Sequence, residues 1–99
     1  MLVRESNGRH RLEADLTFAT VAALHPQGLE TLAAAAPAAS VIFDLGPVRQ
    51  LDSAGLALLV DWLAAARARG VLLRFAGLSA ELRALARLSD VEELLLQPG

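Results

Sequence analysis

The residues best suited to chemistry in this sequence are Asp52 and Ser53, which open an apolar segment with the order Asp-Ser-Ala-Gly. A serine hydroxyl becomes a nucleophile when a histidine takes up its proton and a carboxylate orients that histidine. The chain has two histidines, His10 and His25, and neither stands in a pattern that places it beside Ser53. A hydrolase that uses Ser53 as its nucleophile is therefore the least favoured interpretation, because no general base is evident.

Metal and cofactor chemistry is not indicated either. No spacing of His, Asp and Glu resembles a ligand set for zinc or calcium, and the chain has no cysteine, which fits a reducing compartment. No GxGxxG or Walker-type glycine loop is present, so we expect no cofactor. The net charge is −2 and the arginines are scattered, which leaves no basic stripe for nucleic acid.

Asp52 and Ser53 also have a structural and a regulatory interpretation. Both residue types are preferred at the N-cap of a helix, where a side-chain oxygen accepts a backbone N–H. A phosphate on Ser53 would meet free N–H groups and the positive end of the helix dipole, so this serine is a candidate phosphorylation site. Gly55 would let the backbone of a partner approach, although a tight first helical turn explains this glycine equally well.

The elements that position these residues follow from the hydrophobic pattern. Residues 40–45 form a continuous apolar run typical of a central strand buried on both faces, and residues 71–76 predict another buried strand. Between them, residues 53–69 have the period of a helix that Gly70 ends. The side chains expected to pack on the sheet are Leu56, Leu59, Val60 and Leu63.

The opposite face of this helix is unusually apolar for a surface in contact with water, since small residues and a single acid occupy it. A flat patch with an aromatic residue at its flank suits close packing by another protein. An alanine-rich composition, with Trp62 covered by loops, is the alternative explanation. The predicted partner-binding residues are Asp52, Ser53, Ala54, Gly55, Ala57, Leu58, Asp61, Trp62 and Ala65, with Leu58 and Trp62 as anchors.

The first third of the chain predicts a hairpin and a helix. Residues 1–5 and 10–16 read as strands on either side of Asn7-Gly8, a dipeptide typical of hairpin turns. The helix that follows contains Pro26 and Gly28, which we expect to interrupt it.

The last third predicts a helix capped by Ser79, and then residues 91–96 as a final strand or a helical turn. Residues 1–99 are expected to form one α/β domain, with a mixed, largely parallel sheet of four to five strands and helices mainly on one face. The longest uncharged runs, 16–29 and 31–43, are too short to span a bilayer, so we expect no direct membrane insertion. No apolar signal-peptide region follows the first residues.

The strand at 41–45, the Asp52-Ser53-Ala54-Gly55 corner and the return strand at 71–75 together resemble the STAS domain family, which includes the bacterial anti-sigma factor antagonists. The resemblance covers essentially the whole chain. It implies a mixed sheet with helices on one side. It also implies regulation by protein contact and by phosphorylation rather than catalysis.

Within the family, the sequence is most similar to the MlaB type, the small single-domain subunits of bacterial phospholipid-trafficking ABC transporters. The similarity lies in residues 55–59, 75–78, 85–88 and 91–94. It implies a non-enzymatic cytoplasmic module that binds the transporter's ATPase subunit, supports its assembly or activity, and is peripheral to the inner membrane through that partner.

The alternative is an anti-sigma factor antagonist, whose partner is an anti-sigma factor kinase that phosphorylates Ser53. MlaB-like sequences often carry threonine at this position, which leaves open whether Ser53 acts by contact or by phosphorylation. An exposed apolar helix face would also allow a homodimer in isolation.

Overall fold

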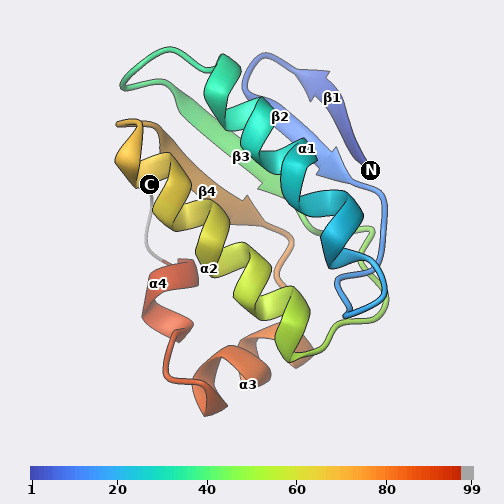
Figure 1. Ribbon diagram of the computed structural model, residues 1–99. Coiled ribbons are helices and arrows are strands. Elements are labelled where there is room, and N and C mark those ends of the chain that lie inside the picture. The colour runs from blue at the N-terminus through green and yellow to red at the C-terminus, as the bar shows by residue number, and fades with distance from the viewer. Residues whose placement is uncertain (97–99) are drawn as a thin grey trace.

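The computed structural model of the chain describes residues 1–96, in which two helices cross one face of a four-stranded sheet (Figure 1). Residues 97–99, the end of the expected domain, lie outside the described part. The sheet order is β1-β2-β3-β4, with β1 antiparallel to β2 and the other neighbours parallel. The predicted α/β fold with a mixed, largely parallel sheet is therefore confirmed. The elements in chain order are β1 (Leu2–Ser6), β2 (Arg9–Leu12), α1 (Val21–Ala34), β3 (Ser40–Asp44), α2 (Ser53–Ala68), β4 (Leu72–Ala76), α3 (Ala80–Leu88) and α4 (Glu92–Leu96).

Strands β3 and β4 are each buried mainly on one face, so the expectation that residues 40–45 form a strand buried on both faces is wrong. In β3, Val41 and Phe43 are buried beneath the helices, whereas Ile42 between them is only half-buried. In β4, Leu73 is buried and Arg74 is exposed. A continuous apolar run resembles a doubly covered strand in sequence, but the helices leave the second face of this sheet open.

The predicted hairpin is present, with Gly8 at a φ of +77° in its turn. The second strand, β2, ends at Leu12 and is shorter than the expected 10–16. Leu16 instead forms an isolated parallel bridge to Leu51 and is fully buried. This bridge brings the segment before α1 against the loop that leads into α2.

Helix α1 runs without a break through Pro26 and Gly28, so the predicted interruption is wrong. Pro26 removes one helical N–H, but tertiary contacts hold the turn together. Trp62 of α2 donates its indole N–H to the carbonyl of His25 at 3.2 Å. Gly28 is buried directly beneath the Trp62 ring, where an added Cβ would lie only 2.1 Å from Cε2. The glycine serves packing between helices, not flexibility.

The C-terminal elements follow the local signals closely. Gly70 ends α2 with a φ of +71°, and the Ser79 hydroxyl accepts the Leu82 N–H at 3.0 Å as the N-cap of α3. The two readings of residues 91–96 are resolved in favour of a helical turn, α4, whose Leu95 is buried. None of the described helices is both long enough and apolar enough to cross a membrane.

Candidate partner-binding site

The corner between β3 and α2 is tied to the segment that precedes α1. The backbone N–H of Asp52 donates to the carbonyl of Leu16 at 3.0 Å, and the Leu16 N–H donates to the carbonyl of Gln50 at 2.9 Å. Two segments far apart in the sequence thus meet at the first turn of α2. The candidate site is therefore built from both of them.

Asp52 is the N-cap of α2, and its carboxylate joins the two segments. Oδ1 accepts the Gly55 N–H at 3.1 Å, and Oδ2 accepts the Phe18 N–H at 2.9 Å. The bond from Phe18, followed by that from Gly55, lowers the pKa of Asp52 below its usual value, because both stabilise the charged form. The carboxylate is therefore fixed in place by its own chain.

Ser53 is the first residue of α2 and is exposed, and of the two residues that could cap the helix it is Asp52 that does so. Within residues 1–96 its hydroxyl has no hydrogen-bond partner. The hydroxyl is free to meet another molecule.

The sequence suggested that Gly55 would leave space for a partner, but the structure leaves none there. It is buried, and an added Cβ would lie 2.0 Å from the carbonyl oxygen of Leu16. The close approach that requires glycine is made by the protein's own chain, at the crossing of the two segments described above.

The outward face of α2 is narrower than predicted. Ala57 and Asp61 are exposed, and Ala54 and Ala65 are half-buried. The expectation that Leu58 and Trp62 face outward is wrong, because Leu58 is 4% exposed and Trp62 is fully buried.

The helical wheel assumed a single buried side, toward the sheet. Helix α2 is also covered along one flank by α1, which buries Leu58 and Trp62, and Trp62 packs edge-on against Phe43 at 5.3 Å between ring centroids. Val60 and Leu63, expected to pack on the sheet, are only half-buried. The buried sector of the helix is thus rotated toward α1.

A shallow groove of about 220 Å³ runs between α1 and α2 on the outer surface, beside Ser53. Its lining is small and apolar apart from one imidazole and one carboxylate. This groove brings together four of the predicted residues with three from α1 that the sequence did not suggest: Ala54, Ala57, Leu58, Asp61, Val21, Ala22 and His25.

Phe18 is the residue that sequence reasoning missed. It lies in the loop before α1 and is 82% exposed, and its backbone is bonded to Asp52 at the edge of the same surface. An aromatic side chain held open to water by a fixed backbone is typical of an interface anchor. The available signal was a large aromatic residue among Thr17, Ala19 and Thr20, outside any helical or strand period.

The histidines do not complete a catalytic group with Ser53. His10 lies on β2 and packs edge-on against Phe43, with ring centroids 6.0 Å apart. His25 lines the groove, but no hydrogen bond or ion pair joins it to Ser53 or Asp61 in the described chain. The same residues, 1–96, hold no cluster of three side chains able to ligate a metal.

The order of strands and the corner where Asp52 caps the helix that begins with Ser53 define the class of protein. A family model for STAS domains matches residues 4–97, and the chain therefore belongs to the STAS domain family. That model is described as "Mlab, STAS domain", so within the family the chain is of the MlaB type. No curated protein matched the chain in a sequence comparison.

Proposed function

We propose that this protein binds the cytosolic ATPase subunit of a phospholipid-trafficking ABC transporter and supports the assembly or activity of that subunit without catalysing a reaction itself. Membership of the MlaB type supports the kind of partner. The exposed Phe18 beside the free Ser53 hydroxyl is the observation that supports contact as the mode of action. On this proposal the protein is cytoplasmic and reaches the inner membrane through its partner.

The proposed contact area is the Phe18–Ser53 surface, which we define as Phe18, Ser53, Ala57, Asp61 and the groove between α1 and α2. Alanine at the exposed position of α2 lets a helix of the partner approach closely. Phe18 supplies a large apolar side chain, and Ser53 and Asp61 supply polar groups at its margin. Ala54 and Ala65 contribute at the half-buried edges of α2.

Co-purification with the ATPase subunit tests this assignment. Phe18→Ala removes the aromatic side chain and Ala57→Glu places a charge in the groove, and we expect each to reduce the affinity by at least about tenfold. Leu72→Ala is the matched control, because Leu72 is an exposed apolar residue on the open face of the sheet. Full retention of binding by Phe18→Ala and Ala57→Glu would contradict the proposed surface.

The second candidate function is an anti-sigma factor antagonist controlled by phosphorylation of Ser53, and the exposed, unbonded hydroxyl supports it. The neighbouring Asp52 carboxylate already accepts the N–H groups of Gly55 and Phe18. A phosphate on Ser53 would add further negative charge beside this carboxylate. Incubation with an anti-sigma factor kinase followed by intact-mass measurement separates the two functions. A stoichiometric added phosphate that abolishes partner binding would favour the switch, and unchanged mass would favour the transporter role.

A further inference from the structure

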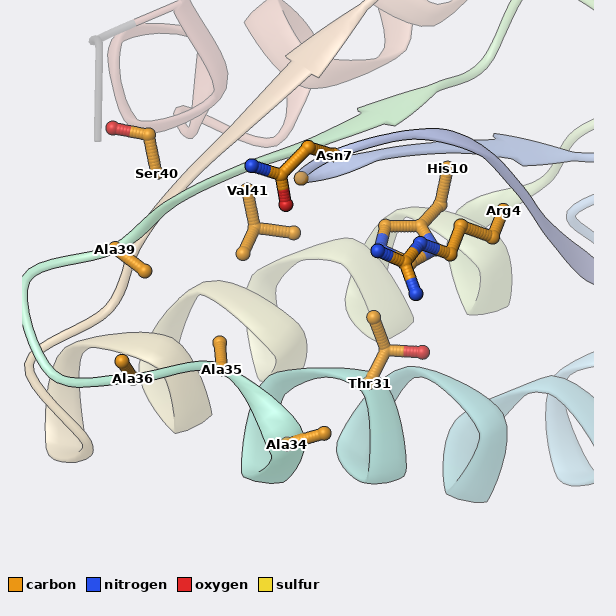
Figure 2. Close-up of a pocket in the computed structure, with 11 residues that line it drawn as sticks. Arg4, Asn7, His10, Thr31, Ala34, Ala35, Ala36, Ala39, Ser40 and Val41 are labelled. Atoms are coloured by element: carbon orange, nitrogen blue, oxygen red, sulfur yellow. The ribbon is translucent and has the colours of Figure 1, made fainter.

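A second cleft lies at the other end of α1 from the Phe18–Ser53 surface. It has a volume of about 430 Å³, within the range of roughly 300–1,000 Å³ usual for small-molecule sites. The hairpin turn forms one side, the end of α1 the second and the start of β3 the third (Figure 2).

Two nitrogen-bearing side chains enter this cleft from neighbouring strands. Arg4 of β1 is the register partner of His10 of β2, and Figure 2 shows both side chains directed toward α1. The amide of Asn7 stands above them at the hairpin turn. No acidic side chain lines the cleft.

Arg4 differs from the other arginines of the hairpin. Arg9 forms ion pairs with Glu5 and Asp44. Arg11 forms ion pairs with Glu5 and Glu13. Across residues 1–96, no carboxylate lies within ion-pair distance of the Arg4 guanidinium. A guanidinium presents a planar set of N–H donors that matches the oxygens of a carboxylate or phosphate.

The pKa of His10 depends on its burial and on the neighbouring charge. Burial, and then the neighbouring Arg4, lower the pKa of His10, so its imidazole is largely neutral at pH 7. Arg4 and His10 are the charged and titratable groups among the residues that line the cleft. A dianion placed between them would favour the protonated imidazole, and the cleft would then offer two positive charges.

The rest of the lining is small and apolar, with Ala34, Ala35, Ala39 and Val41 among its members. The carbonyl end of α1 also borders this part, and the negative end of a helix dipole disfavours an anion there. The charged part of a ligand would therefore lie at Arg4 and His10, and an apolar part would lie toward the alanines.

We propose that this cleft binds a small organic phosphate monoester, with the phosphate on Arg4 and His10 and the organic group against the alanine wall. A dianionic phosphate matches the charges of the arginine and a protonated imidazole, whereas a carboxylate would balance the arginine alone. The site is separate from the Phe18–Ser53 surface, so it does not depend on the proposed partner.

Titration of the full chain with phenyl phosphate, followed by NMR of the two histidine rings in a phosphate-free buffer, tests the proposal. We expect the pKa of His10 to rise on binding, while His25, in the groove between α1 and α2, serves as an internal control and does not change. Arg4→Gln should weaken binding by about tenfold, and Arg83→Gln, an exposed arginine on α3, should not.

Inorganic phosphate and benzoate distinguish the two parts of the ligand. Weaker binding of inorganic phosphate would support contact with the alanine wall, and weaker binding of benzoate would support the need for a dianion. Equal binding of benzoate, equal shifts of both histidines, or an unshifted His10 at millimolar phenyl phosphate would each overturn the proposal.

Discussion

The backbone N–H of Phe18 donates to Oδ2 of Asp52 at 2.9 Å, across 34 positions of sequence. The other oxygen of that carboxylate caps α2 through the Gly55 N–H. One side chain therefore sets the start of the helix that carries Ser53 and also holds the loop that carries the exposed aromatic residue. The geometry of the Phe18–Ser53 surface depends on this carboxylate.

Replacement of Asp52 by alanine should destabilise the protein more than replacement of Ser53 by alanine. Asp52→Ala leaves the Gly55 and Phe18 N–H groups without their acceptor, whereas Ser53→Ala removes an exposed hydroxyl that has no hydrogen-bond partner in the described chain. Urea unfolding followed by circular dichroism measures both variants. An equal midpoint for Asp52→Ala and the wild type would contradict the capping role.

The contribution of Asp52 should also depend on pH. Its pKa is lowered in the folded protein, so the unfolded chain binds the proton more readily. The stabilisation is therefore fully present above the unfolded value of about 3.9 and is lost as the pH falls through the lower folded value. The measurement compares the free energy of unfolding of the wild type with that of Asp52→Asn, which does not titrate.

The difference between these two proteins should be constant from neutral pH down to about pH 5 and should shrink below about pH 4. A difference that stays the same throughout the acidic range would show that the charge of Asp52 does not stabilise the fold.

Local signals predicted the fold well because they act over a few residues. The Asn7-Gly8 turn, the cap at Ser79 and the stop at Gly70 each have a short-range physical cause, and all three are present. The mixed, largely parallel sheet followed from the alternation of strands and helices after the first hairpin. These features are readable without any knowledge of tertiary contacts.

The features that could not be predicted depend on which helix packs against which part of the molecule. Nothing near Trp62 in the sequence shows that α1 lies along that flank of α2, so a wheel with a single buried side placed this residue outward. Gly28 looked like a helix breaker because its packing partner is 34 positions away. Phe18 joined the site through a bond to Asp52 that no local pattern encodes.

Substitution of Gly28 by alanine tests the contact between the two helices. The added methyl group would meet the Trp62 ring, which is itself fully buried and cannot move aside easily. We expect a loss of about 1–3 kcal/mol in the free energy of unfolding, the usual range for overpacking. Gly46→Ala is the control, because its added Cβ would meet only the Asp44 side chain, at 3.1 Å. Equal stability of the two variants would argue against close packing of α1 on α2.

Substitution of Gly55 by alanine should affect stability and partner binding together. An added Cβ would collide with the carbonyl of Leu16, which is backbone and must shift as a whole. Leu16 is two positions before Phe18, so that shift displaces the loop that holds the aromatic side chain. We expect a loss of about 1–3 kcal/mol in the free energy of unfolding. We also expect weaker binding to the ATPase subunit at temperatures where the variant remains folded.

Ala64→Ser is the matched control for Gly55→Ala, because it makes a small change at an exposed position of the same helix, outside the Phe18–Ser53 surface, and should leave the fold intact. Thermal unfolding and titration calorimetry on the same samples separate the two effects of Gly55→Ala. If Gly55→Ala lowers the stability but the folded variant binds the subunit as tightly as the wild type, the position of the Phe18 loop does not control the interface.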